Sequence, residues 1–197
     1  AAVRNHKNAI VYNHQVTFAL YDAHNKLIGN TIEKAVELVD STSKSTVAES
    51  LTVPNVTKWN AEQPYLYTLV VQLKDSKGQV IESTAQKIGF RKIAYKSNQL
   101  LINGKAVAIK GININTNSPT ISTLEHWKRE LRLMKQHNIN AIWVNGGSPN
   151  RQFYELCDFY GFYVIDQVNI QTFGWLQSDI WEMAYTNRAR ALWEQNK

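Results

Sequence analysis

The chain of 197 residues contains a single cysteine, Cys157. One thiol cannot form an internal disulfide or a zinc cluster, which excludes a small disulfide-stabilised domain and a cysteine-rich metal site. Cys157 lies among apolar residues on an expected helix, so we interpret it as a buried structural thiol. A reactive nucleophile would need a histidine partner, and the sequence places none beside it.

Long apolar runs are also absent. A membrane-spanning helix needs roughly 18 or more consecutive apolar residues, and no such run occurs, so we predict no membrane span. The first seven residues lack the apolar stretch of a signal peptide. A mature or truncated chain would begin in the same way, so the compartment stays open between the cytoplasm and a periplasmic or secreted location.

Charge of one sign is not concentrated anywhere. The formal net charge of +6 is spread over both halves, without the basic cluster that tracks phosphates, so we expect no nucleic-acid partner. The five histidines show no ligand spacing, and we predict neither a metal site nor a cofactor. The 44% of hydrophobic residues suffice for a core, which excludes a disordered chain.

The first half has the pattern of short strands. Residues 16–21 and 27–28 flank a turn-rich stretch, and residues 67–73 and 79–82 flank a second turn that contains Gly78. Short strands at this spacing, without helical periodicity between them, predict an antiparallel sandwich.

The second half begins with a hairpin signal and then changes rhythm. Residues 100–102 and 106–109 are expected strands on either side of Asn103-Gly104. Ser122 and Glu125 form the pattern of a capping box. The helix that follows is expected to carry its apolar side chains on one face: Leu124, Trp127, Leu131 and Met134.

Strands and helices then alternate. Residues 140–144 and 162–165 are expected strands, Asn150 caps the helix between them, Gly161 ends it, and Asp179 opens a last helix. This alternation predicts parallel strands with crossover helices, and three such units make part of a closed eight-stranded barrel.

Several motifs resemble family 2 glycoside hydrolases of the β-galactosidase type, in register from about residue 57 to 166. The segments 59–67 and 88–93 are similar to the family's immunoglobulin-like domain, and the segments 101–105, 109–113, 133–141, 154–161 and 163–166 are similar to the opening of its barrel. The resemblance implies a multidomain α and β fold, with an immunoglobulin-like β-sandwich at 1–95 and the N-terminal part of a TIM barrel at 96–197.

The resemblance also implies an activity. The family hydrolyses β-linked sugars with retention, and this chemistry needs two carboxyl groups about 5 Å apart. In the family both glutamates follow the segment that corresponds to Lys197. We therefore predict a fragment of a β-galactosidase-like glycoside hydrolase that is inactive alone, and we assign no catalytic residue.

Three loops depart from the family's pattern. Asn115 stands where a histidine lines the sugar pocket, and the stretch after residue 144 lacks the family's arginine and histidine. Gln171 and Phe173 replace a glutamate and a histidine that help to hold magnesium in metal-dependent members. A hard cation prefers anionic oxygen, so these two residues do not fit that metal.

The remaining polar and aromatic residues of these loops are candidate sugar contacts, each with a structural alternative. Asparagines are common in loops, Asp166 can orient a neighbouring loop, and Trp143 is expected in the core. The predicted substrate-binding residues are Asn115, Asn145, Asp166, Gln171 and Trp175.

The alternative function is a non-catalytic carbohydrate-binding or scaffold module. In either case we expect weak binding of a β-galactoside-like carbohydrate at most. Three parallel strands cannot close a barrel, so their edges keep unpaired backbone groups, and we predict self-association through the open edge.

Overall fold

The computed structural model describes residues 1–6, 9–10, 12–37, 44–115, 123–145, 149–168 and 179–196. These residues form two compact units, Ala1–Lys58 with Tyr65–Phe90 and Trp59–Pro64 with Arg91–Lys197. The chain therefore passes between the units three times. The limits 1–95 and 96–197 of the two predicted domains stay a prediction.

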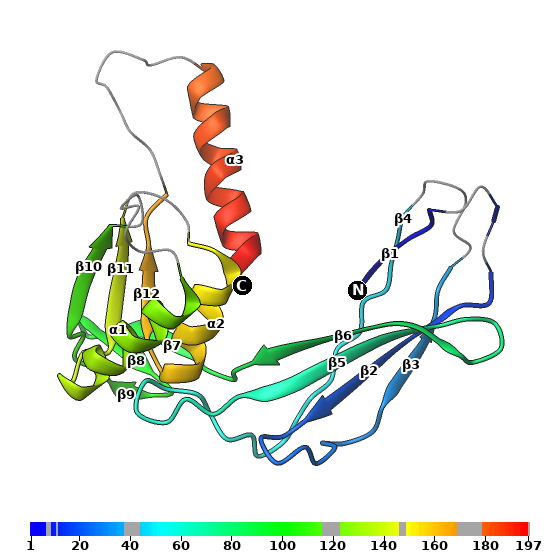
Figure 1. The fold of residues 1–197 in the computed structure, drawn as a ribbon, viewed down its shortest axis with the longest axis horizontal. Helices are drawn as coiled ribbons and strands as arrows, with labels where there is room; N and C mark the ends of the chain where they lie inside the picture. Colours follow the sequence, from blue (N-terminus) through cyan, green and yellow to red (C-terminus); the bar gives the residue numbers. More distant parts are fainter. Residues whose placement is uncertain are drawn as a thin grey trace. The chain divides into compact units, whose positions relative to one another are not determined.

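The first unit contains a four-stranded antiparallel sheet and a separate antiparallel pair of strands (Figure 1). The sheet has the order β3-β2-β5-β6, and β1 pairs with β4. The two sheets share a hydrophobic cluster around Val16, Val36 and Val47. The strands are β1 (Ala2–Arg4), β2 (Gln15–Tyr21), β3 (Ile32–Ala35), β4 (Lys44–Thr46), β5 (Tyr67–Lys74) and β6 (Val80–Ile88).

The predicted hairpin between β5 and β6 is confirmed. Its turn is organised by the Asp75 carboxylate, which accepts hydrogen bonds from the backbone N–H groups of Lys77 (2.8 Å) and Gln79 (2.9 Å). Gly78 supplies the positive φ of 79° that the turn requires. The predicted strand at 27–28 is wrong, because Leu27 forms only an isolated bridge to Tyr21.

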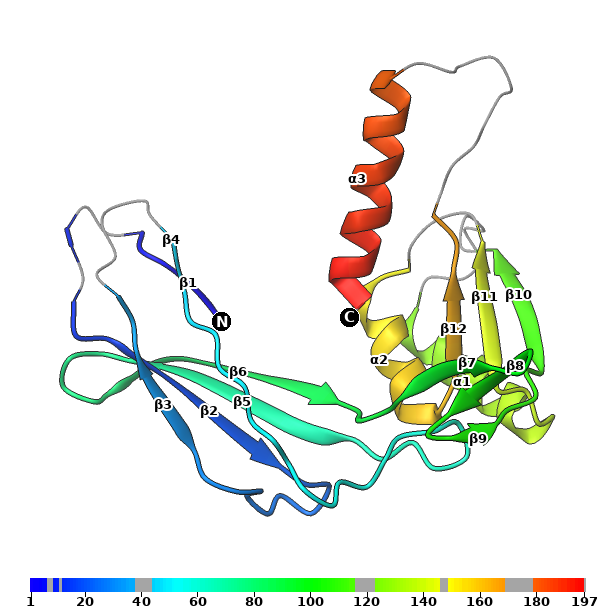
Figure 2. The ribbon, with the colours of Figure 1, turned by 180° about the vertical axis from the view of Figure 1, so that it is seen from behind.

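The second unit opens with a small antiparallel sheet, β7-β8-β9, visible in both views (Figure 2). The Asn103-Gly104 turn is confirmed, with φ of 54° and 83°, as a two-residue hairpin of this type needs. The predicted strand 106–109 is shorter than expected. The strands are β7 (Ile93–Lys96), β8 (Gln99–Ile102) and β9 (Lys105–Ala106).

The predicted alternation of parallel strands and helices is confirmed. Three parallel strands lie in the order β10-β11-β12, with α1 connecting the first two and α2 connecting the last two (Figure 1). The elements are β10 (Gly111–Asn115), α1 (Leu124–Gln136), β11 (Ala141–Asn145), α2 (Arg151–Tyr160), β12 (Tyr163–Asp166) and α3 (Asp179–Asn196).

The ends of the helices follow from their capping residues. The Thr123 side chain accepts the N–H of His126 at the start of α1, so the predicted cap at Ser122 is wrong by one residue. The predicted ends of α2 are confirmed: the Asn150 side chain accepts the N–H of Phe153 at 3.0 Å, and Gly161 ends the helix in the left-handed conformation.

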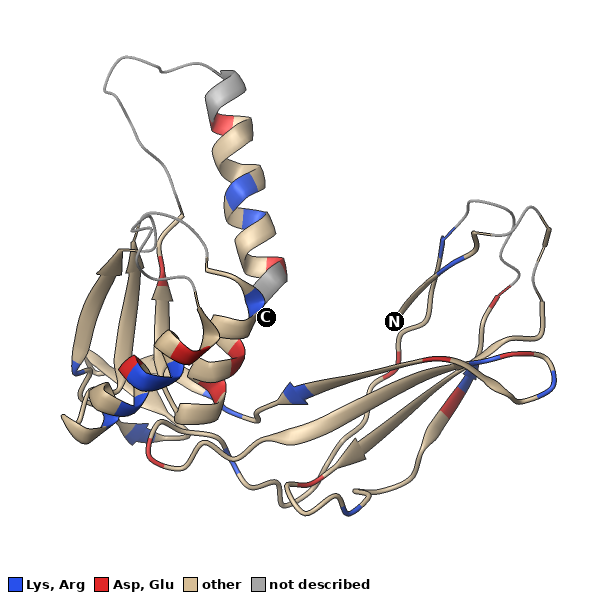
Figure 3. Ribbon diagram, viewed as in Figure 1, with Lys and Arg blue, Asp and Glu red and all other residues tan. Residues whose placement is uncertain are grey.

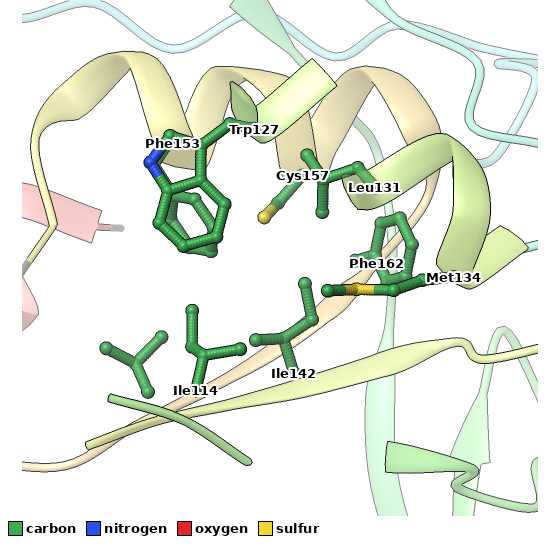
Figure 4. Close-up of a cluster of buried hydrophobic side chains, with 9 residues drawn as sticks. Ile114, Trp127, Leu131, Met134, Ile142, Phe153, Cys157 and Phe162 are labelled. Carbon is green, nitrogen blue, oxygen red and sulfur yellow. The ribbon is translucent and has the colours of Figure 1, made fainter. Parts of the chain in front are cut away.

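The core of the second unit lies between α1, α2 and one face of the parallel sheet, as Figure 4 shows. Trp127 and Phe153 meet edge to face with ring centroids 4.6 Å apart. Burial of each large side chain stabilises the fold by about 1.5–3 kcal/mol. The buried members are Ile114, Trp127, Leu131, Met134, Ile142, Val144, Phe153, Cys157 and Phe162.

Charged positions of both signs are interspersed along α1 and over the strands (Figure 3). Within the described ranges, no helix has the length and the apolar character needed to cross a membrane.

Candidate functional site

The candidate site lies at the carboxyl ends of β10, β11 and β12. Parallel strands end at one common edge, and in TIM barrels that edge carries the substrate site. Asn115 ends β10 and Asn145 ends β11, and the register pairs these two residues directly. Asp166 ends β12 and is level with Val144 of β11. The structure therefore brings two of the predicted residues, Asn115 and Asn145, side by side.

The two faces of this sheet differ in character. Successive side chains of a strand point to opposite faces, and Ile114, Ile142 and Val144 face the helices within the core. The register aligns Asn113, Trp143 and Ile165 in one row across the three strands. Asn115 and Asn145 follow Asn113 and Trp143 by two residues, so they lie on the same face of the sheet as this row. We call Asn113, Asn115, Trp143, Asn145 and Ile165 the open face.

The prediction that Trp143 packs in the core is wrong, because its side chain lies on the open face and not between the sheet and the helices. Its side chain is 50% exposed, and Ile165 beside it is 47% exposed. The prediction failed because a strand with one covered face resembles a fully buried strand when its exposed residue is apolar. A half-exposed indole beside amide side chains can stack on the apolar face of a sugar ring while the amides bond to hydroxyl groups.

Asp166 lies on the other side of β12. Its carboxylate accepts a hydrogen bond from the Tyr154 hydroxyl of α2. The next residue, Gln167, donates its backbone N–H to the carbonyl oxygen of Val144 at 3.3 Å. Burial raises the pKa of Asp166, while the hydrogen bonds from Tyr154 and from the Gln167 backbone oppose that shift. Asp166 therefore joins β12 to α2 and does not share the side of the two asparagines.

Sequence reasoning gave Tyr154 no role beyond the family motif. Tyr154 lies in the first turns of α2, twelve residues before Asp166, and its apolar neighbours hide its polar contact. The spacing of twelve residues, which leads from the first turn of α2 into β12, was the feature of the sequence that could have indicated this contact. Two further predicted contacts, Gln171 and Trp175, lie outside the described residues, as does Phe173.

Cys157 is a buried thiol of the core with 1% exposure. Burial raises its pKa strongly, and the charge of Asp158 adds to that effect, so the thiolate that a nucleophile needs is disfavoured. In the parts of the chain that the structure covers, no three His, Cys, Asp or Glu side chains group in a way that could hold a metal ion.

Two family models match the chain. The model described as "Glycosyl hydrolases family 2" matches residues 2–91, and "Glycosyl hydrolases family 2, TIM barrel domain" matches residues 93–195. Together they span nearly all of both structural units.

Curated relatives are named β-galactosidase. That of Vibrio vulnificus is 41% identical over 151 residues, which is 72% of this chain and 15% of the relative. Those of Halalkalibacterium halodurans and Vibrio cholerae are 36% and 32% identical and cover 79% and 95% of this chain. The chain spans only 15–20% of the length of these relatives.

Solved structures of similar fold include β-glucuronidases. That of Bacteroides uniformis superposes with a TM-score of 0.75 at 20% identity, covering 89% of this chain and 22% of its own. That of Parabacteroides merdae gives a TM-score of 0.72 at 24% identity, covering 92% and 22%. At these identities the likeness concerns the fold.

Proposed function

This chain belongs to glycosyl hydrolase family 2, and we propose that the longer protein of which it is a fragment hydrolyses β-galactosides. The identities of 32–41% to proteins named β-galactosidase support this substrate. The β-glucuronidases share the fold at lower identity and carry less weight for the choice of sugar.

The chain alone is proposed to be inactive. A retaining glycosidase needs two carboxyl groups about 5–5.5 Å apart, one as nucleophile and one as acid and base. The three described strands end in Asn115, Asn145 and Asp166, which supply one carboxyl group. That carboxyl group bonds to Tyr154 of α2. The observation that carries this proposal is the single acid among the three strand ends, and no residue of the chain is proposed as catalytic.

The contribution of this chain is proposed to be weak carbohydrate binding on the open face. The amides of Asn115 and Asn145 both donate and accept hydrogen bonds, which suits neighbouring hydroxyl groups of a sugar. Trp143 lies two residues before Asn145 on β11 and offers a half-exposed ring on the same face. Gln171 and Trp175 remain proposed contacts, and Asp166 is proposed to act by orienting the segment that follows β12.

Two measurements on purified chain 1–197 test this function. Nitrophenyl β-galactoside should not be hydrolysed, and calorimetric titration with lactose should give weak heat that Asn115→Ala or Asn145→Ala reduces. Asn25→Ala, in a turn of the first unit, is the matched control and should leave the heat unchanged. Absence of heat with lactose, glucuronides and mannosides alike would favour an inert scaffold module. Galactose release that disappears when one Asp or Glu of this chain is replaced would refute the proposed inactivity.

Self-association is the further part of the proposal. In the described part of the chain β10 and β12 each pair with β11 on one side. The other side of each strand carries backbone groups that a second copy can pair with. We propose that copies of this chain associate through these edges.

A further inference from the structure

Residues 59–64 come from the stretch between β4 and β5 of the first unit, yet they pack as part of the second unit. We call them the 59–64 segment. Trp59 is its anchor, with 1% exposure. The indole N–H donates to the carbonyl oxygen of Asp158 at 2.9 Å, and the ring meets Tyr163 edge to face at 5.6 Å. The Arg91 guanidinium lies over the indole at 5.0 Å.

The backbone of Ala61 is bound on both sides. Its N–H donates to the Tyr163 hydroxyl at 3.3 Å, and its carbonyl oxygen accepts from the Lys135 ammonium at 3.0 Å. The same ammonium donates to the carbonyl oxygen of Gly161 at 2.6 Å. Ala61 is 4% exposed. A larger side chain at this buried position would have to displace its neighbours, which favours a small residue.

The segment also has an internal order that lowers the cost of binding. The Asn60 side chain accepts the N–H groups of Glu62 (3.0 Å) and Gln63 (2.9 Å), which forms an Asx turn. The Asn60 N–H donates to the carbonyl oxygen of Gln63 at 3.1 Å. A turn that is formed before docking loses less conformational entropy when it docks.

Two further contacts complete the surface that receives the segment. The Asn103 side-chain amide donates to the carbonyl oxygen of Trp59 at 3.0 Å. Burial lowers the pKa of Lys135, and the charge of Glu62 opposes that shift. The receiving residues therefore all follow residue 90: Arg91, Asn103, Lys135, Asp158, Gly161 and Tyr163.

We propose that these residues form a peptide-binding site, which takes a short stretch of the pattern Trp-Asn-small. The 59–64 segment fills the site within its own chain, and the same stretch binds it in trans when the internal one is disabled. A buried tryptophan anchor joined to main-chain hydrogen bonds is the arrangement by which short peptides are recognised in sequence. Tethering at both ends gives the internal segment an effective concentration on the order of millimolar, which keeps the site closed to other peptides.

The test uses the full chain with Trp59→Ala, which removes the anchor and leaves the receiving residues intact. A fluorescent peptide of residues 57–66 is titrated, with polarisation as readout. The variant should bind it saturably and the unaltered chain at least about 10-fold more weakly, since its site is filled. A peptide with alanine at the tryptophan position should bind at least about 10-fold more weakly than its parent. Equal binding of the two peptides would overturn the proposal.

Hydrogen exchange on the same samples locates the binding. The peptide should restore protection in α2 and β12 of the Trp59→Ala chain and leave β2 and β5 unchanged. Trp127→Ala is the matched control. This variant also loses a buried tryptophan of the core, but its 59–64 segment is unaltered. Binding of the peptide to that variant as tightly as to Trp59→Ala would speak against a specific site. If Trp59→Ala is unfolded, regain of its near-ultraviolet dichroism on adding the peptide supports the site, and no regain contradicts it.

Discussion

Gly161 and Ala61 pack backbone against backbone, although 100 positions separate them in the chain. A Cβ atom at Gly161 would lie 3.1 Å from the carbonyl carbon of Ala61 and 3.2 Å from its Cα atom. Gly161 also has a φ of 81° as it ends α2. Two independent requirements, a left-handed conformation and a close backbone approach, therefore fall on one residue.

Gly161→Ala should destabilise the chain more than the left-handed conformation explains. That conformation alone costs about 1–2 kcal/mol for a residue with a Cβ atom. The matched control is Gly104→Ala in the β8–β9 turn, where φ is 83° and no atom lies within 4 Å of the added Cβ. Urea denaturation should show a loss for Gly161→Ala that exceeds that of Gly104→Ala by at least about 1 kcal/mol, the cost of a strained close contact. Equal losses would mean that the helix moves away from the 59–64 segment freely.

Asn103→Asp should weaken the contact between the β8–β9 turn and Trp59. The Asn103 oxygen accepts the Lys92 N–H at 2.9 Å, and this acceptor survives in aspartate. The amide N–H₂ that donates to the carbonyl oxygen of Trp59 is lost. We expect a loss of about 1–3 kcal/mol in the free energy of unfolding, because a buried acceptor loses its donor.

Asn98→Asp is the control for that measurement. Asn98 also has a positive φ, of 60°, and its oxygen accepts the Tyr95 hydroxyl, so aspartate keeps the bond. The free energy of unfolding should change by less than about 0.5 kcal/mol. A comparable loss at both positions would assign the effect to the turn backbone and not to Trp59.

Asp166→Asn should remove a pH dependence of stability. The pKa of Asp166 is raised above 3.8 in the folded chain, chiefly by burial. Between 3.8 and that raised pKa the folded state binds more protons than the unfolded state, so stability falls as the pH rises through this window. Relative to the variant, the unaltered chain should lose stability over the same window, measured by urea denaturation at stepped pH.

Asp75→Asn should show the opposite sign. Hydrogen bonds from the backbone N–H groups of Gln79 and Lys77 lower the pKa of Asp75 in the folded chain. Its carboxylate therefore contributes stability above 3.8 that is lost as the pH falls through the lowered pKa. Parallel pH profiles for the two variants would show that burial does not govern Asp166.

Ile165→Lys should reduce the proposed self-association. Ile165 lies on the edge strand β12 and is 47% exposed, so a lysine there places a charge on the edge that a second copy would meet. Light scattering over a concentration series should show a smaller mean mass for the variant. Ile81→Lys on β6, where the isoleucine is 55% exposed, is the matched control and should leave the mass unchanged. A monodisperse monomer for the unaltered chain at all concentrations would end the proposal.

The fold class was predictable because its signals are local. Gly78, Gly104 and Gly161 occupy positions with positive φ that glycine tolerates, and Asn150 caps α2 as its position in the sequence indicates. The predicted immunoglobulin-like sandwich followed by the start of a TIM barrel is confirmed by the family models and the similar folds.

The site was less predictable because it depends on faces and distant partners. Whether Trp143 is buried depends on which face of the sheet the helices cover. The sequence of one strand does not show which of its faces is covered. The contact of Asp166 with Tyr154, and the docking of Trp59 on Asp158, join segments that no periodicity links. The short strands β1, β4 and β7 escaped prediction for the same reason, since their partners and not their composition define them.

During synthesis, the 59–64 segment can dock only after its partners in α2 and β12 have been made. The acceptor of the Trp59 indole is made 99 residues later, and the hydroxyl that receives the Ala61 N–H is made 102 residues later. At synthesis rates of roughly 5–20 residues per second, about 5–20 s separate the emergence of the tryptophan from that of its partners. During this interval the nascent chain presents an uncovered indole between two of its early strands. A chaperone that recognises exposed aromatic side chains would find its binding site there, and the emergence of residues 158–163 from the ribosome would release it.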